Sequence, residues 1–235
     1  MPPSIGPSSS VVQSTPHRLL LASTSRWRRE LLAAAGIPCL AVAPDVNEDE
    51  HGSPGDDPVA VARLRALAKA RAVAGRNPGR IVVGADQVVH LDGAWVGKPT
   101  DPEDWLRRLR SFRGREHLLT TAVAICDEAG EESFEVHSAV RFRSDLSDAD
   151  LRAYIAHGEA AGCAGGYMVE GRGAWLVEAV EGDWTNVVGL PIFALVGRLR
   201  SRGWRLCADG LARAPQEPMP VDGSDVAHDV EEARS

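Results

Sequence analysis

Residues 21–32 of the sequence, LASTSRWRRELL, place three hydroxyl side chains directly before a cluster of arginines. If a strand stops at Ser23 and the chain passes into a helix, free backbone N–H groups and the positive end of the helix dipole point outward there. Phosphates bind at such helix starts, and guanidinium groups such as those of Arg28 and Arg29 suit phosphate oxygens. A capped surface helix with solvated arginines is the alternative. Because positive charge at a helix N-terminus is unfavourable, the arginines indicate an anion that compensates them.

A second stretch, residues 82–101, places Asp86 inside an apolar run that has the character of a buried strand. A carboxylate there requires a metal, a cationic partner or a catalytic role, unless it ends the strand and accepts backbone N–H groups. Lys98 follows twelve residues later, across a predicted hairpin turn at Asp92 and Gly93. The hairpin would allow Lys98 to return and face Asp86.

A third stretch, residues 163–191, carries Glu170 between glycines that permit close backbone approach to a ligand. Glu170 could accept hydrogen bonds from a small molecule, or it could be an ordinary loop carboxylate. Glu48 and Lys69, taken in isolation, are typical of solvated side chains. The sequence has neither a Walker-type phosphate loop nor a GxGxxG motif after a strand. Phosphate binding would therefore use the helix start and separate basic side chains.

Hydrophobic periodicity predicts the elements that must position these residues. We expect strands at 17–23, 38–44, 80–93, 118–126, 132–143 and 173–182, the third interrupted by Gly84, Ala85 and Asp86. We expect helices at 26–36, 57–75, 101–112, 147–158 and 190–203. The sum is an α/β fold, a mixed sheet with flanking helices. We expect one domain at 17–207, between a disordered N-terminal extension at 1–16 and an acidic, disordered tail at 208–235.

Composition excludes several classes of protein. The net charge is −7, but much of the acidic excess lies in 208–235, so the domain is near neutral and has no large basic surface for nucleic acid. No apolar run approaches the ~20 residues of a membrane span, and the N-terminus does not have the pattern of a signal peptide. We therefore expect a cytoplasmic protein that binds no membrane. The four cysteines are far apart, which indicates free thiols rather than a zinc site or a disulfide framework.

Taken together, these stretches resemble the Maf family of nucleotide pyrophosphatases. The resemblance runs from about Leu19 to Leu199 and rests on LASTSRWRRELL, PDVNED, VVGADQVVHLDGAWVGKP and AGGYMVEGRGAWLVEAVEGDWTNVVGLP, in that order. It implies a fold like that of inosine triphosphatase, with two lobes around a deep cleft, often as a homodimer. It also implies hydrolysis of a nucleoside triphosphate to the monophosphate and pyrophosphate, with Mg²⁺ or Mn²⁺ as cofactor.

The resemblance also implies roles for individual residues. Glu48 corresponds to an acidic position that would hold the metal together with Asp86. Asp86 corresponds to the family's proton acceptor, and whether it acts chiefly as base or as metal ligand stays open. The residues that correspond to the family's phosphate-binding positions are Ser23, Arg28, Arg29, Lys69 and Lys98.

Three further positions favour a methylated guanine nucleotide. The branch of the family that acts on dTTP and UTP typically has Arg, Thr and Gln where this sequence has Trp27, Gln87 and Glu170, and the sequence resembles instead the branch that acts on 7-methyl-GTP. A cationic 7-methylguanine ring would stack on Trp27 with ~1–2 kcal/mol when desolvated. The Glu170 carboxylate could accept hydrogen bonds from N1–H and N2–H₂ of guanine. Arg26 departs from this pattern, because proline usually occupies its position.

Two alternatives to a 7-methyl-GTP pyrophosphatase stay open. One is a dTTP/UTP or broad-specificity nucleotide pyrophosphatase. The other is a non-catalytic, nucleotide-binding regulator of septum formation, although such a protein has no need of the metal and base residues.

Overall fold

The computed structural model describes residues 17–52 and 56–214. The expected extension at 1–16, and residues 215–235 of the expected tail, lie outside the described residues. Within the described ranges, no helix is long and apolar enough to cross a membrane.

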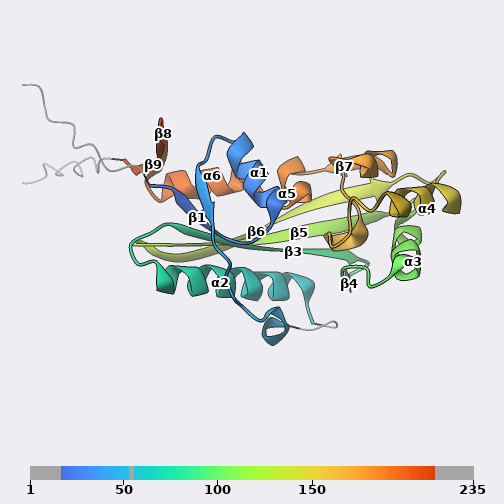
Figure 1. Ribbon diagram of the computed structural model, residues 1–235, viewed down its shortest axis with the longest axis horizontal. Coiled ribbons are helices and arrows are strands. Elements are labelled where there is room, and N and C mark those ends of the chain that lie inside the picture. The colour runs from blue at the N-terminus through green and yellow to red at the C-terminus, as the bar shows by residue number, and fades with distance from the viewer. Residues whose placement is uncertain (1–16, 53–55, 215–235) are drawn as a thin grey trace, which may run out of the picture.

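A mixed sheet of seven strands forms the centre of the part of the chain that is described (Figure 1). Its order is β2-β1-β3-β5-β6-β7, and β4 pairs with β3. β1 runs parallel to β2 and β3, whereas the other pairs are antiparallel. The strands are β1 (Leu19–Ala22), β2 (Cys39–Ala41), β3 (Val82–Leu91), β4 (Ala94–Val96), β5 (Glu116–Asp127), β6 (Gly130–Phe142) and β7 (Val177–Glu181).

Helices flank this sheet, as the sequence predicted. α2 lies on one side of the strands, α1 and α6 lie on the other, and α3 and α4 lie at the far end (Figure 1). The helices are α1 (Arg26–Ala34), α2 (Pro58–Arg76), α3 (Pro102–Phe112), α4 (Asp148–His157), α5 (Trp184–Val188) and α6 (Ile192–Ser201). Short 3₁₀ helices are η1 (Glu48–His51), η2 (Ala164–Gly166) and η3 (Arg172–Trp175). The predicted mixed α/β fold is confirmed.

The apolar strands are buried because helices cover both of their faces. Leu19 and Leu21 of β1 pack in one hydrophobic cluster with residues of α1 and α6. Leu20, whose side chain points to the opposite face, packs in another cluster with the alanines of α2. A third cluster joins the ends of β3, β5 and β6 to α3, α4 and the segment 160–169. The hydrophobic core thus consists of three clusters, one on each face of the sheet at β1 and a third that joins the strand ends to α3 and α4.

β3 is continuous through Gly84, Ala85 and Asp86, so the interruption predicted there was wrong. These residues pair with β1 on one side or β5 on the other without a break in register. Gly84 is needed for packing rather than for a turn. A Cβ at this position would lie 2.4 Å from the carbonyl oxygen of Ala66 and 2.7 Å from the backbone nitrogen of Ala70. At Gly84, therefore, the backbone of β3 packs directly against the backbone of α2.

The C-terminal boundary predicted at residue 207 was also wrong. β8 (Trp204–Cys207) and β9 (Gly210–Arg213) form a hairpin across it. Leu211 of β9 is buried, and its backbone exchanges two hydrogen bonds with His17. The hairpin is too short to produce a clear alternation in the sequence, which is why hydropathy assigned it to the tail. The folded domain extends at least to residue 214.

Candidate active site

A cavity of about 560 Å³ opens where β1, β3, α1 and α2 meet the segment 161–170. Its walls come from parts of the chain far apart in the sequence, which include the start of α1, the 3₁₀ helix η1 and the end of α5. The predicted site residues that line it are Ser23, Trp27, Arg28, Glu48, Lys69, Asp86, Gln87, Lys98 and Glu170. The structure therefore brings nine of the ten predicted site residues to one cavity.

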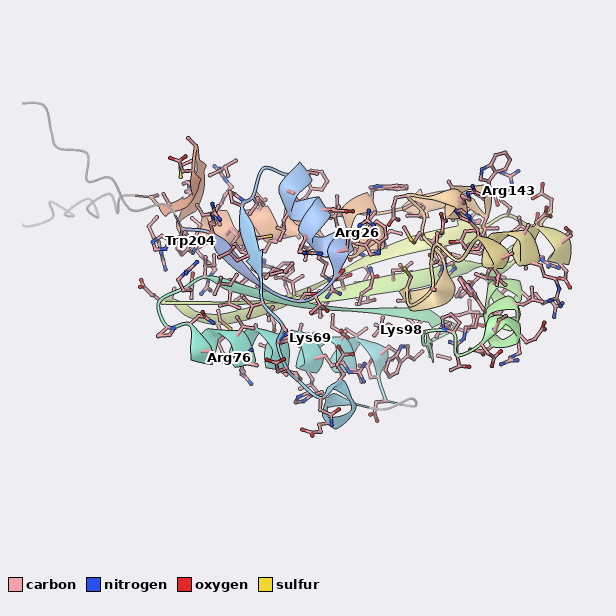
Figure 2. All side chains as sticks on the ribbon, viewed as in Figure 1. Arg26, Lys69, Arg76, Lys98, Arg143 and Trp204 are labelled. Atoms are coloured by element: carbon pink, nitrogen blue, oxygen red, sulfur yellow. The ribbon has the colours of Figure 1, made fainter. Side chains whose placement is uncertain are left out.

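Lys69 contacts two carboxylates in this cavity, those of Glu48 and Asp86. Its Nζ donates a hydrogen bond to Oδ1 of Asp86 at 2.6 Å and forms an ion pair with Oε1 of Glu48 at 2.7 Å. Lys69 lies between α2 and the sheet (Figure 2), where its side chain is 8 % exposed and that of Asp86 is 10 % exposed. The close contact at Gly84 allows this arrangement, because it brings α2 near enough for Lys69 to reach the strand. Asp86 is thus a buried carboxylate with a cationic partner, as a strand carboxylate requires.

Glu48 is the more exposed member of this group. Partial burial raises the pKa of its carboxyl, but the hydrogen bond and charge of Lys69, with the charges of Arg65 and Lys98, outweigh burial. The net effect is a pKa below the ordinary value of a glutamate. The cavity therefore stabilises negative charge at Glu48.

Ser23 and Arg28 form the wall of the cavity at the end of β1. Arg28 donates from Nη1 to the carbonyl of Ala85 at 2.8 Å and from Nε to the carbonyl of Gly189 at 3.0 Å. The Ser23 hydroxyl oxygen accepts from Arg28 at 3.4 Å. Burial lowers the pKa of the Arg28 guanidinium, and the charges of Asp86 and Glu48 oppose that effect. Arg28 therefore ties the start of α1 to β3 and α5 while it keeps a cationic surface on the cavity.

Arg29 lies outside this cavity. Its side chain is exposed, and its charge acts on Cys39 of β2, where it lowers a thiol pKa that burial raises by more. Each residue of an α-helix is rotated about 100° from the one before it, so neighbours in sequence face different directions. The sequence did not show which of the two adjacent arginines would face the site.

Lys98 reaches the cavity through the predicted hairpin. Asp92 and Gly93, both at positive φ, form the turn between β3 and β4. The turn reverses the chain, so that Val96 pairs with Val89 and Lys98 follows two residues later. The Lys98 side chain is exposed and lines the cavity.

Trp27, Gln87 and Glu170 also line the cavity. Trp27 is half-buried, and the Arg26 guanidinium lies 4.9 Å above its ring while it pairs with Glu30 at 2.7 Å. Partial burial raises the pKa of the Glu170 carboxyl. The Gln87 side-chain nitrogen donates to the Asn186 carbonyl at 2.6 Å, so this nitrogen is already engaged by the protein.

Two residues that the sequence did not single out also line the cavity. Arg65 on α2 is buried, and Trp95 on β4 covers its guanidinium at 5.0 Å. Arg65 comes one helical turn before Lys69, on the same face of α2. That spacing is a signal that could have identified it.

Comparison with known proteins agrees with this geometry. A sequence model of the Maf family, described as Maf-like protein, matches residues 18–202. The chain belongs to the Maf family. Its family membership and its mixed sheet with flanking helices together confirm the Maf fold expected from the sequence.

Two groups of Maf relatives have names that differ in substrate. A protein of Nitratidesulfovibrio vulgaris named dTTP/UTP pyrophosphatase is 42% identical over 189 residues, which covers 80% of this chain and 89% of the relative. A protein of Bordetella pertussis named 7-methyl-GTP pyrophosphatase is 39% identical over 185 residues, which covers 78% of this chain and 92% of the relative. The solved Ham1 protein of Staphylococcus aureus is 14% identical, with a TM-score of 0.39 over 54% of this chain and 72% of that chain.

Glu48 and Asp86 are carboxylates of the cavity that could hold a hard divalent cation. Each contacts the Lys69 ammonium through one oxygen, Oε1 at 2.7 Å and Oδ1 at 2.6 Å, so both carboxylates lie next to the same cationic group. Mg²⁺ is usually held by one or two carboxylates together with substrate phosphates and water. Within residues 17–52 and 56–214, no group of three or more His, Cys, Asp or Glu side chains could hold a metal. A metal at Glu48 and Asp86 would therefore take its remaining ligands from the substrate and from water.

Proposed function

We propose that this Maf protein hydrolyses a nucleoside triphosphate between its α- and β-phosphates, with a nucleoside monophosphate and pyrophosphate as products. One observation carries the proposal, namely the convergence of Lys69, Glu48 and Asp86 at 2.6–2.7 Å inside a cavity. The names of the relatives support the same reaction class, because both groups are named pyrophosphatases.

Each step of this reaction has a residue that lines the cavity to carry it out. Water attacks the α-phosphorus, the bond from that phosphorus to the bridging oxygen breaks, and pyrophosphate leaves. Asp86 accepts the proton of the attacking water. Arg28, Lys69 and Lys98 stabilise the negative charge of the phosphates and of the leaving group. Mg²⁺ or Mn²⁺ held by Glu48 and Asp86 would supply further neutralisation of phosphate charge.

We propose 7-methyl-GTP as the preferred nucleotide. Trp27 offers an aromatic face to a cationic base, and Glu170 offers carboxylate oxygens to the donors on the guanine edge. Thymine and uracil present one N–H between two carbonyls, so a carboxylate would face at least one carbonyl oxygen. Arg26 lies over the Trp27 ring and also lines the cavity, which supports a role for it beside the bound base. A dTTP/UTP or broad-specificity enzyme is the second candidate, and the relatives of that name support it.

A panel of nucleotides tests both parts of the proposal. Pyrophosphate release is measured with 7-methyl-GTP, GTP, dTTP, UTP and CTP, with Mg²⁺ or Mn²⁺ and after chelation. We expect metal-dependent release with the highest kcat/KM for 7-methyl-GTP. Higher kcat/KM for dTTP and UTP would favour the second candidate, and no release with any nucleotide would overturn the reaction class. The homodimer and the cytoplasmic location stay predictions, which sedimentation and cell fractionation would check.

A further inference from the structure

Glu48 lies on a segment that has little stability of its own. η1 is a single turn of 3₁₀ helix, Glu48–His51, and no other helix or strand includes residues 42–47 before it. One such turn has too few internal hydrogen bonds to fix its own position. Contacts from elsewhere in the fold must therefore place the Glu48 carboxylate beside Lys69.

Arg65 provides these contacts at both ends of η1. Its Nε donates to the carbonyl of Glu48 at 3.0 Å, and its Nη2 donates to the carbonyl of Gly52 at 2.9 Å. Nη1 lies 3.8 Å from Oε2 of the Glu48 carboxylate. Arg65 is 7 % exposed, and both hydrogen bonds are partly buried. One buried side chain thus holds both the backbone and the carboxylate of the segment.

Gly52 allows the segment to approach α2 this closely. Its φ is +120°, and a Cβ there would lie 2.4 Å from Cγ2 of Val61, one turn before Arg65. The backbone at Gly52 therefore lies directly on the helix surface, where the Arg65 guanidinium reaches its carbonyl. The contact depends on glycine for both space and conformation.

Trp95 on β4 is a second contact of Arg65 in the lining of the cavity. The Arg65 guanidinium carbon lies 5.0 Å from the centroid of the Trp95 ring. Trp95 belongs to β4, which ends at Val96, and Lys98 follows two residues after that strand. Arg65 therefore contacts both the segment that carries Glu48 and the β3–β4 hairpin that leads to Lys98.

We propose that Arg65 is a positioning residue that fixes Glu48 and the β3–β4 hairpin, which leads to Lys98, relative to one another before the ligand binds. Arginine suits this task because its planar fork reaches two carbonyls while its flat face meets an indole, and lysine offers neither geometry. The functional consequence rests on the proposed role of Glu48 in metal and phosphate binding. The structural part, the anchoring of η1, stands on the contacts alone.

The test compares Arg65→Leu and Arg65→Lys with a matched control, Arg63→Leu. Arg63 lies on the same helix, is exposed, and pairs with Glu135 outside the cavity. Three quantities are measured in the full chain: amide hydrogen exchange of residues 46–52, Mn²⁺ affinity by calorimetry without nucleotide, and kcat and KM for nucleotide hydrolysis. Circular dichroism checks that each variant is folded.

We expect faster exchange at 46–52 in both Arg65 variants, and a fall of about 10- to 100-fold in Mn²⁺ affinity for Arg65→Leu, as for other residues that orient metal ligands. The Mn²⁺ affinity of Arg65→Lys should lie between those of Arg65→Leu and wild type. Arg63→Leu should match wild type in both amide exchange and Mn²⁺ affinity. Unchanged exchange and unchanged Mn²⁺ affinity in Arg65→Leu would overturn the proposal. If Arg65→Leu shows faster exchange at 46–52 and weaker Mn²⁺ binding than wild type, but wild type hydrolyses no nucleotide, the proposed function fails while the role of Arg65 stands. If Arg65→Leu does not fold, the same two measurements on Arg65→Lys decide.

Discussion

Gly84 on β3 lies so close to Ala66 on α2 that a Cβ on the glycine would come within 2.4 Å of the alanine carbonyl oxygen. This contact sets the distance between the helix and the strand. Two residues further along β3 is Asp86, and three residues further along α2 is Lys69. The ion pair at the centre of the site therefore depends on a glycine that contributes no side chain to it.

Replacing this glycine should separate the helix from the strand. Gly84→Ala is expected to lower the free energy of unfolding by about 1–3 kcal/mol, because overpacked cores cost that much, and to reduce kcat through the lengthened Lys69–Asp86 contact. The measurements are urea denaturation and steady-state hydrolysis. Gly75→Ala is the matched control, since Gly75 lies near the end of α2 with nothing within 4 Å of its Cβ position. That control should keep full activity and gain up to about 1 kcal/mol in helix stability. An unchanged free energy of unfolding and an unchanged kcat in Gly84→Ala would contradict the close contact.

The two adjacent arginines at the start of α1 should behave differently. Arg28→Ala removes the donors to the carbonyls of Ala85 and Gly189, which should cost about 1–3 kcal/mol in unfolding free energy and at least tenfold in kcat/KM. Arg29→Ala removes an exposed charge outside the cavity, so its free energy of unfolding should stay within about 0.5 kcal/mol of the wild-type value. Thermal unfolding and hydrolysis assays compare the two variants. Equal losses in both variants would show that Arg29 also acts in the site.

Substrate preference should follow Trp27 and Glu170. The double variant Trp27→Arg with Glu170→Gln places a cation and a neutral amide where a cationic base would bind. The ratio of kcat/KM for 7-methyl-GTP over dTTP should fall at least tenfold, since the lost cation–π contact alone is worth ~1–2 kcal/mol. Trp175→Arg, at a tryptophan that is 82 % exposed and outside the cavity, is the control and should leave the ratio unchanged. A double variant with an unaltered ratio would favour the broad-specificity alternative.

Acid stability should depend on His117. Burial lowers the pKa of this imidazole to about 3, with a smaller contribution from the charge of His90. In the unfolded chain a histidine titrates near pH 6.5, so the unfolded state takes up the proton first as the pH falls. The stability that comes from the neutral ring is complete above about pH 6.5 and is lost progressively toward pH 3.

The variant His117→Phe checks this dependence, because the ring already stacks on Phe112 with centroids 3.9 Å apart. We expect a smaller loss of unfolding free energy between about pH 6.5 and 4 than in wild type. At pH 7 the variant should be somewhat less stable, because the Tyr167 hydroxyl loses its partner at 2.7 Å. Urea denaturation at several pH values measures both effects. Identical pH slopes would contradict a neutral, buried His117.

The sequence was sufficient to predict most elements, and most of the residues singled out near their ends line one cavity. Strand runs, capping residues and the Asp-Gly turn are local signals, and the elements they predicted are present. Lys69 and Arg65 were not distinguishable from solvated residues, because hydropathy interprets a charge on a helix as exposed. Their burial depends on a face of α2 built from small alanines and on the contact with Gly84. That arrangement is a property of two elements together, and no single stretch of sequence contains it.

Asp86→Asn tests the central claim most directly, through pyrophosphate release from 7-methyl-GTP with Mg²⁺ or Mn²⁺. Wild type should release one pyrophosphate for each nucleoside monophosphate, and Asp86→Asn should lose at least about 100-fold in rate, because it removes the proton acceptor. Asp145→Asn, at an exposed aspartate paired with Arg143 outside the cavity, is the control and should keep the wild-type rate. Equal rates for wild type and Asp86→Asn, or release of orthophosphate instead of pyrophosphate, would contradict the account.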